Sequence, residues 1–222
     1  MKKIIYIFRH GETNFNKQKR FQGWLDVPLN KEGVAQAHEL ARKISDMKFD
    51  CVYSSSLSRA LDTAKILIAD QDIKVIANDD LREWNLGDLS GKIVRISDMP
   101  IDTPIDFNAD IIYVPFALMS NDDYVLPNGE SYNMFAERVC GAIKDIVNKT
   151  DGKNIAIVAH GGVAKVLIKS LTNVHWSSIG MPNAGFFKLE YDGKKFSMPE
   201  IPDWLSYSQQ MSLVTDVAKK VR

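Results

Sequence analysis

The chain has few of the features that mark secreted, membrane or nucleic-acid-binding proteins. Two cysteines, Cys51 and Cys140, are too few for a disulfide framework in 222 residues. No apolar run approaches the ~20 residues of a membrane span, and the run Ile4–Phe8 is too short for a secretory signal. Acidic and basic residues number 28 each, so no global field favours nucleic acid or an anionic membrane. We therefore expect a cytoplasmic protein with no nucleic-acid or membrane partner.

Several catalytic patterns are also missing. The glycine-rich phosphate loops of nucleotide enzymes do not occur. A zinc-protease pattern begins at His38, but Arg42 stands where its second histidine is required. A nucleophile elbow begins at Gly129, but Asn133 stands where glycine is required. Neither cysteine precedes the short loop and arginine of a cysteine phosphatase.

The sequence does contain short apolar runs that alternate with segments of helical period. The runs predict strands at Lys3–Phe8, Cys51–Tyr53, Ile73–Ile76, Asn154–Ala159 and Phe186–Tyr191. This alternation indicates an α/β fold, a three-layer sandwich whose mostly parallel central sheet has helices on both faces.

Four helices are predicted between the strands. The first follows an Asn30 cap, and its apolar face carries Val34, Ala37, Leu40, Ala41, Ile44 and Met47. The second covers Leu57–Ala69 behind Ser56 as its cap, and the third follows a Ser131 cap. The fourth covers Val163–Leu171.

Two segments do not follow this alternation of strands and helices. From Gly91 to Pro127 no period is sustained, so we expect an inserted lid over the active site, within a single domain that spans residues 1–222. Near the C-terminus, apolar residues recur at three- or four-residue spacing over Trp204–Val221. This spacing favours a helix that packs on the domain over a dimer seam, and both a monomer and a homodimer remain open.

Polar residues that follow strands are the candidates for chemistry, because ligands in open α/β sheets bind beyond the carboxyl ends of strands. Arg9 and His10 follow the first predicted strand, Arg59 the second, Glu83 the third and His160 the fourth. An arginine disfavours the imidazolium form of a neighbouring histidine, and its donors match phosphate oxygens.

Together these residues supply what phosphoryl transfer from a monoester requires. His10 is a candidate nucleophile, the arginines are cationic donors, and Glu83 beside Trp84 is a candidate acid, since an aromatic neighbour can help a carboxyl group to hold a proton. Gly11 and the pair Gly161-Gly162 allow the backbone to approach a ligand. Such an arrangement needs no metal.

Six motifs occur in a set order along the chain. They are Arg9-His10-Gly11-Glu12-Thr13 with Asn16; Gln22-Gly23 with Asp26, Pro28 and Leu29; Ser54–Ala60 with Thr63; Leu81-Arg82-Glu83 with Gly87 and Gly91; Gly129-Glu130-Ser131; and Ala159-His160-Gly161-Gly162. In this order they resemble the histidine phosphatase superfamily, also called the phosphoglycerate mutase-like family, over most of the chain.

The resemblance implies a role for each principal residue. His10 would become phosphorylated, Arg9 and Arg59 would hold the phosphoryl group, His160 would donate to its oxygens, and Glu83 would be the acid that then activates water. By the same implication, further residues would line the phosphate pocket, namely Thr13, Asn16, Gln22, Gly23 and Gly161.

We therefore expect a metal-independent phosphomonoesterase that acts on a small phosphorylated metabolite without a cofactor. One alternative is a phosphoglycerate mutase that depends on 2,3-bisphosphoglycerate. Glycolytic members of the family resemble one another in placing several basic residues after the acid, whereas Gly91–Pro127 has Lys92 and Arg95 against six aspartates, and Trp84 stands where a cation is expected. A second alternative is a phosphate-binding module without activity, against which the intact catalytic residues argue.

Overall fold

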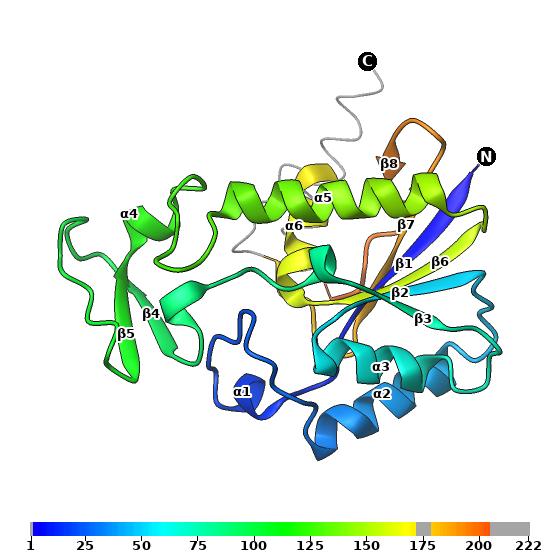
Figure 1. Cartoon of the computed structure of the whole chain (residues 1–222), viewed down its shortest axis with the longest axis horizontal. Coiled ribbons are helices and arrows are strands. Elements are labelled where there is room, and N and C mark those ends of the chain that lie inside the picture. Colours follow the sequence, from blue (N-terminus) through cyan, green and yellow to red (C-terminus); the bar gives the residue numbers. More distant parts are fainter. Residues whose placement is uncertain (1, 172–178, 205–222) are drawn as a thin grey trace.

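The computed structural model describes residues 2–171 and 179–204 and is built around a six-stranded sheet (Figure 1). Its strands are β1 (Lys3–Arg9), β2 (Cys51–Ser55), β3 (Val75–Asn78), β6 (Asn154–Ala159), β7 (Phe186–Tyr191) and β8 (Phe196–Ser197). The order is β3-β2-β6-β1-β7-β8; the first four run parallel, β7 is antiparallel to β1, and β8 is antiparallel to β7. The predicted mostly parallel sheet is confirmed.

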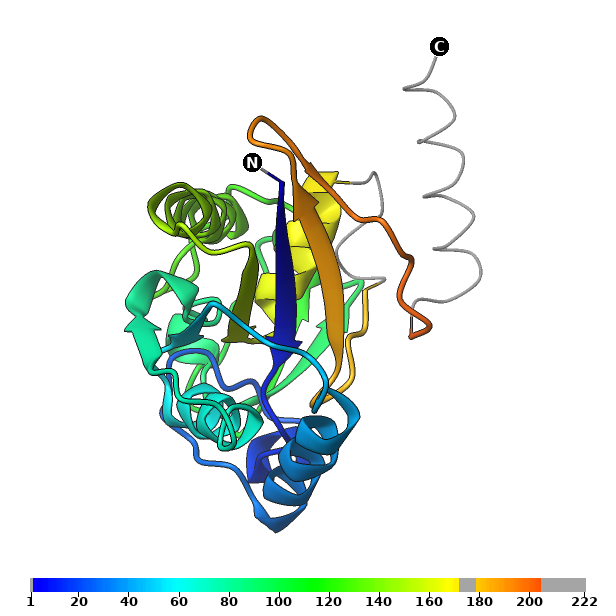
Figure 2. The ribbon, with the colours of Figure 1, turned by 90° about the vertical axis from the view of Figure 1, so that its right-hand side faces the viewer.

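Helices cover both faces of this sheet (Figure 2). They are α2 (Lys31–Lys43) and α3 (Ser58–Leu67) on one face, and α5 (Tyr132–Lys149) and α6 (Gly161–Leu171) on the other. Alternate side chains of a strand point to opposite faces. In β1, Ile5 and Ile7 therefore pack in the core with α5 and α6, whereas Phe8 packs with α2 and α3.

The helix starts follow the sequence signals in two cases and not in a third. Side-chain oxygens of Asn30 and Ser131 cap α2 and α5, as predicted. The prediction that Ser56 caps α3 is wrong, because the helix begins at Ser58 without a cap from its own segment. The backbone N–H of Ser58 instead donates to Oδ1 of Asp26 at 2.7 Å.

Two further details differ from the sequence patterns. β3 covers Val75–Asn78 instead of Ile73–Ile76, because the register with β2 places Val52 opposite Val75. Val34, expected on the buried face of α2, is 38% exposed.

The segment from Gly91 to Pro127 contains structure that its sequence did not reveal. Strands β4 (Ile93–Ser97) and β5 (Ile111–Pro115) form a separate parallel pair, followed by the short helix α4 (Phe116–Met119). In β5, apolar side chains occupy exposed positions as well as buried ones, so the sequence shows no alternation of polar and apolar residues. Buried side chains of β5 and α4 join loop residues in a small apolar cluster formed by Leu86, Leu89, Ile112, Val114, Met119 and Leu126.

The remaining elements are short. α1 covers Asn14–Lys17, and two 3₁₀ turns cover Asp79–Leu81 and Gly87–Leu89. The C-terminal helix predicted over Trp204–Val221 lies beyond Trp204, outside the described residues. Within the part of the chain that the structure describes, no helix has the length and apolar character needed to cross a membrane.

Candidate active site

The carboxyl edge of the central sheet brings two histidines together. β1 and β6 pair in parallel with Arg9 opposite Ala159, so His10 and His160 each follow a paired residue. Their ring centroids lie 5.2 Å apart, and both side chains are buried. The register of two neighbouring strands therefore determines the distance between these two rings.

The hydrogen bonding of His10 determines which of its nitrogens is available for reaction. Nδ1 lies 2.6 Å from the carbonyl oxygen of Gly11, which can only accept, so Nδ1 carries the hydrogen. In the neutral ring Nε2 then keeps its lone pair. Burial, followed by repulsion from Arg59 and Arg9, lowers the pKa of His10 well below 6.5. His10 is thus a neutral imidazole with an unprotonated nitrogen.

Two arginines flank this ring, of which Arg59 is buried and Arg9 is half-buried. Arg59 has no exposed surface and donates to the backbone carbonyls of Leu25 and Gly23 at 2.8 and 2.9 Å. Arg9 donates to the carbonyl of Met181. Burial lowers the pKa of Arg59 to about 10 and also lowers that of Arg9. Both remain cationic near neutral pH, and carbonyl partners do not cancel their charge.

Three buried nitrogens around His10 have no hydrogen-bond partner within residues 2–171 and 179–204: Nε of Arg9, Nε of Arg59 and Nδ1 of His160. The other ring nitrogen of His160 lies 2.8 Å from Oγ of Ser55. A buried polar group without a partner carries a desolvation penalty of roughly 1–3 kcal/mol. An anion with several acceptor oxygens is the type of ligand that would satisfy the two guanidinium N–H groups.

Two side-chain amides complete the polar end of the site. Oε1 of Gln22 lies 3.0 Å from Oγ1 of Thr13, and Oδ1 of Asn16 accepts the backbone N–H of Thr13 at 3.1 Å. Oδ1 of Asn16 also accepts from the side chain of Asn183. Because these contacts occupy the amide oxygens, each residue retains its NH₂ group as a donor toward the cavity that both line.

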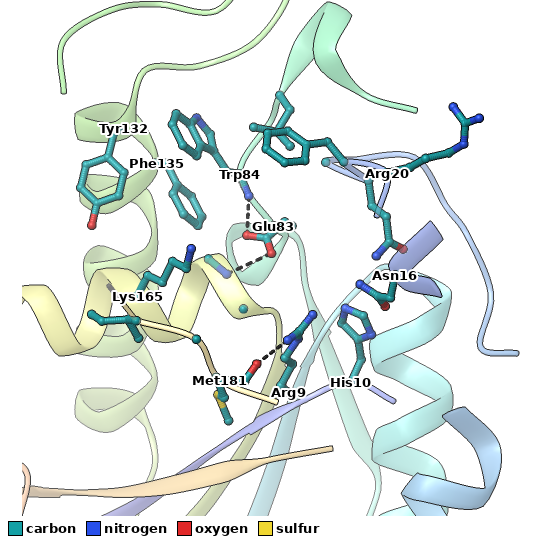
Figure 3. Close-up of a pocket in the computed structure, with 18 of the residues that line it drawn as sticks. Arg9, His10, Asn16, Arg20, Glu83, Trp84, Tyr132, Phe135, Lys165 and Met181 are labelled. Carbon is teal, nitrogen blue, oxygen red and sulfur yellow. Dashed lines mark hydrogen bonds between the residues drawn. The ribbon is translucent and has the colours of Figure 1, made fainter. Parts of the chain in front are cut away.

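Glu83 lies across the cavity from Arg9 and His10 (Figure 3). One carboxylate oxygen accepts the backbone N–H of Trp84 at 2.9 Å, and the other accepts that of Gly162 at 3.0 Å. A Cβ at Gly162 would lie 2.0 Å from Oε1 of Glu83. This close approach requires glycine at position 162, so the second glycine of the His-Gly-Gly motif helps to place the carboxyl group.

The cavity has a volume of about 500 Å³ and becomes apolar away from the two histidines. Trp84 and Phe135 form a parallel stacked pair, with ring centroids 6.1 Å apart. Ile96 and Met119 come from the segment that contains β4, β5 and α4. The other apolar lining residues are Phe21, Leu86, Tyr132, Ile179 and Met181.

The sequence-predicted site residues meet at this one edge of the sheet. Those that line the cavity are Arg9, His10, Asn16, Gln22, Gly23, Arg59, Glu83 and Gly161. His160 and Thr13 are buried behind them, and Thr13 caps α1 and holds Asn16 and Gln22 in place.

Sequence reasoning missed several residues of the site. Lys165 lines the cavity, and burial lowers its pKa below the ordinary value. The nearby charge of Glu83 opposes this shift without reversing it. The position of Lys165 inside the helix predicted over Val163–Leu171, four residues after Gly161, was a usable signal. Met181 and Asn183 gave no such signal, because they reach the site from a loop without periodicity.

Gly11 was expected to let the backbone approach a ligand, but the structure gives its missing side chain a different role. A Cβ at Gly11 would lie 2.3 Å from the carbonyl oxygen of Gly33, and one at Gly33 would lie 2.0 Å from that of Glu12. The missing side chains therefore allow two backbone segments to pack together at the start of α2. Gly161 faces the site, since a Cβ there would lie 3.4 Å from Nε of Arg9.

The residues that the structure describes include no group of three or more histidine, cysteine, aspartate or glutamate side chains placed to hold a metal ion. The ligands that the polar end of the cavity suits are anions, because its side chains offer donors and positive charge.

A protein-family model supports the pattern in this chain. Residues 5–203 match the model of the histidine phosphatase superfamily (branch 1).

Two relatives illustrate the range of activities among similar proteins. A metal-independent phosphoserine phosphatase of Arabidopsis thaliana is 33% identical over 171 residues, which is 76% of this chain and 68% of that protein. A 2,3-bisphosphoglycerate-dependent phosphoglycerate mutase of Parvibaculum lavamentivorans is 32% identical over 178 residues, covering 77% and 80% of the two chains. Sequence identity alone does not separate a phosphatase from a mutase here.

A solved structure shares the fold. The mycobacterial glucosyl-3-phosphoglycerate phosphatase in complex with VO3 superimposes with a TM-score of 0.71 and 28% identity. The match covers 88% of this chain and 96% of that protein. The α/β fold is thus that of known phosphatase structures.

Proposed function

The chain belongs to the histidine phosphatase superfamily, and on that premise we propose that it is a phosphomonoesterase that transfers a phosphoryl group first to His10 and then to water. The observation that carries this proposal is the placement of His10, a buried imidazole whose Nδ1 lies against the carbonyl of Gly11, which leaves Nε2 for the reaction. Burial and the charges of Arg59 and Arg9 lower its pKa and so favour the neutral ring. Phosphatase relatives support the same reaction class.

Binding of the substrate's phosphate compensates for the buried charge of the site. The Nε–H groups of Arg9 and Arg59 lack partners among the described residues and donate to phosphate oxygens. The amides of Asn16 and Gln22, which line the cavity, add further donors. Nδ1 of His160, which is buried next to His10 and has no partner among the described residues, is the remaining candidate donor to an oxygen. Preorganised donors of this kind stabilise the charge that spreads over the oxygens in the transition state.

In the first chemical step, Nε2 of His10 attacks phosphorus and the ester P–O bond breaks. The carboxyl group of Glu83 donates its proton to the departing alkoxide, so an alcohol leaves and Glu83 becomes a carboxylate. In the second step, this carboxylate takes a proton from water while the water oxygen attacks phosphorus. The P–N bond breaks, inorganic phosphate forms, and the lone pair returns to Nε2.

The surroundings of the phosphate site favour water over a second hydroxyl as the acceptor. A mutase must also hold the carboxylate of a phosphoglycerate. Beyond Arg9 and Arg59, the cationic side chains that line the cavity within the described residues are Arg20 and Lys165. Arg20 is already paired with both carboxylate oxygens of Asp110. Most of the remaining wall is apolar, which suits a small phosphorylated metabolite with an apolar portion.

The segment from Gly91 to Pro127 acts in this proposal as a lid. Ile96 and Met119 bring its apolar side chains to the cavity, and Lys169 of α6 pairs with Asp122 at 2.5 Å. The proposed setting is the cytoplasm, since Cys51 and Cys140 are both free thiols.

The reaction class is tested by hydrolysis of 4-nitrophenyl phosphate in the presence of a chelator. We expect turnover by the wild type, none above background by His10→Ala, and a trapped phosphoenzyme that survives alkali but not acid. Equal activity in both proteins would refute a His10 nucleophile. Binding of phosphate without turnover would leave a non-catalytic module.

The acceptor is tested with 3-phosphoglycerate, with and without 2,3-bisphosphoglycerate. A phosphatase releases inorganic phosphate and produces little 2-phosphoglycerate. Rapid exchange between the two isomers with little free phosphate would instead identify a mutase, in which Lys165 is the cation placed to meet the carboxylate.

A further inference from the structure

One guanidinium group on α5 contacts backbone carbonyl groups at Glu83 and in the segment that leads to it. Arg138 donates from Nη1 to the backbone carbonyls of Asp80 and Arg82 at 2.9 and 3.1 Å, and from Nη2 to that of Glu83 at 3.2 Å. Its Nη2 also lies 2.5 Å from Oε1 of Glu130, and its Nε lies 3.3 Å from Oε2. A single planar group thus joins three loop carbonyls to one carboxylate.

Glu130 holds the far side of the same loop. Its Oε1 accepts the backbone N–H of Asn85 at 2.8 Å, and its backbone carbonyl accepts Nε1–H of Trp84 at 2.8 Å. The backbone N–H of Glu130 donates to the carbonyl of Asn85. Arg138 and Glu130 therefore hold the loop both before and after the position of Glu83.

This loop needs partners from outside itself. Between the 3₁₀ turns Asp79–Leu81 and Gly87–Leu89 it has no regular structure, so no ladder satisfies its carbonyl groups. Aromatic rings hold the guanidinium in place: Arg138 lies 5.6 Å from the ring centroid of Trp24 and 5.2 Å from that of Phe135. Nε1–H of Trp24 also donates to the carbonyl of Glu83 at 2.7 Å.

Stability alone does not account for an ion pair in this position. The Arg138 and Glu130 side chains are only 16% and 11% exposed, and apolar replacement of a buried pair is often neutral or stabilising. The rigid fork of an arginine does, however, define the positions of several acceptors at once.

We propose that Arg138, held by Glu130, is a positioning residue that keeps the carboxyl group of Glu83 in reach of the leaving-group oxygen. Arg138 does not line the active-site cavity, so it acts through Glu83. This inference rests on the proposed function, in which Glu83 protonates the leaving alcohol and then activates water.

The test compares leaving groups in Arg138→Met. An alkyl phosphate needs the proton from Glu83, whereas 4-nitrophenolate leaves without one. We expect kcat/KM for an alkyl phosphate to fall about 100-fold, the scale of a 1 Å misplacement. For 4-nitrophenyl phosphate it should change by less than about threefold. Since kcat/KM includes only steps up to release of the alcohol, it isolates the acid step.

A second readout follows the later half of the reaction. Hydrolysis of the phosphoenzyme still requires Glu83 as a base, so Arg138→Met should release 4-nitrophenolate in a burst and then turn over slowly. Glu83→Gln supplies the reference, with the same leaving-group dependence and the same burst.

Controls separate positioning from loss of fold. Val139→Ala removes buried volume from the neighbouring position of α5, where the side chain makes no hydrogen bond to the loop, and should lower the melting temperature while leaving the ratio between the two substrates unchanged. Arg138→Lys keeps the positive charge but loses the planar set of N–H donors. It should show the same leaving-group dependence as Arg138→Met.

Two results would overturn the positioning role. One is an equal loss of kcat/KM on both substrates in Arg138→Met, and the other is full recovery in Arg138→Lys. Failure of the proposed function itself is distinguishable, because the wild type would then form no His10-dependent phosphoenzyme.

Discussion

Two neutral imidazoles beside two guanidinium groups set the pH behaviour of the site. Burial is the largest cause that lowers the pKa values of His10 and His160 well below 6.5, and repulsion from Arg59 is the next. The charge that is missing from these rings is supplied by the arginines. The arrangement keeps a nucleophile unprotonated in surroundings that attract an anion.

We expect the rings of His10 and His160 in the free protein to remain neutral as the pH falls from 8 to 6. NMR titration of the ring resonances measures this directly. The pKa of each folded-state ring lies below the unfolded value, so the associated stability is complete above pH 6.5 and is lost as the pH falls below it. A midpoint at or above 6.5 for His10 would contradict the prediction.

A matched variant separates burial from charge. Arg9→Met removes one of the repulsive charges, so the pKa of His10 should rise. Burial remains the larger cause, and the midpoint should therefore stay below 6.5.

At the scale of elements, the start of α2 depends on a contact between two backbone segments. Gly11 follows the end of β1, and Gly33 lies in the first turn of α2. A Cβ on either would come within 2.3 Å of a backbone oxygen, which cannot move aside as a flexible side chain can. The link between the His10 loop and α2 is therefore sterically strict.

Gly33→Ala should lower the free energy of unfolding by about 1–3 kcal/mol, because the added methyl group overpacks this contact. Urea denaturation gives the value. Gly141→Ala is the matched control: it lies inside α5, with nothing within 4 Å of its Cβ, and should raise stability by about 0.4–1 kcal/mol. Equal changes in the two variants would show that the Gly11–Gly33 contact is not strict.

Strands β4 and β5 and the start of α3 could not be predicted from local sequence patterns. β4 and β5 escaped detection because each has large hydrophobic side chains at exposed positions: Ile96 in β4 is 50% accessible, and Ile111 and Tyr113 in β5 are 44% and 56% accessible. The cap of α3 comes from Asp26, far earlier in the chain, so no local signal at Ser56 could have identified it. Asn30 and Ser131 were identified correctly because their bonds are local.

At the scale of the whole molecule, charge is balanced overall but unequal locally. The formal net charge is +0, yet Arg9 and Arg59 meet at one buried edge of the sheet. An anion that binds there relieves their mutual repulsion and satisfies their unpartnered Nε–H groups. Such a ligand binds the native state and not the unfolded chain, and so stabilises the fold.

Inorganic phosphate should therefore raise the melting temperature of the wild type, with a stabilisation of about 2.7 kcal/mol at 100 times its Kd. Differential scanning calorimetry measures the shift, and chloride at equal ionic strength is the control. Arg59→Met should lose the response. A similar shift with chloride, or in Arg59→Met, would contradict binding by the arginine site.

The sequence by itself determined the faces of the sheet and two helix caps, and it selected the residues that we propose for the site, because period, capping and motif spacing are local properties. The residues predicted for the site do lie together, since parallel strands end at one edge. Their proposed roles await the experiments above.

Only the tertiary structure decided the rest, because it depends on contacts between distant segments. The register of β1 with β6 sets the separation of His10 and His160. The backbone N–H of Gly162 and the guanidinium of Arg138 place Glu83 from α6 and α5. Neither contact has a sequence period, since each is created where separate elements pack against one loop.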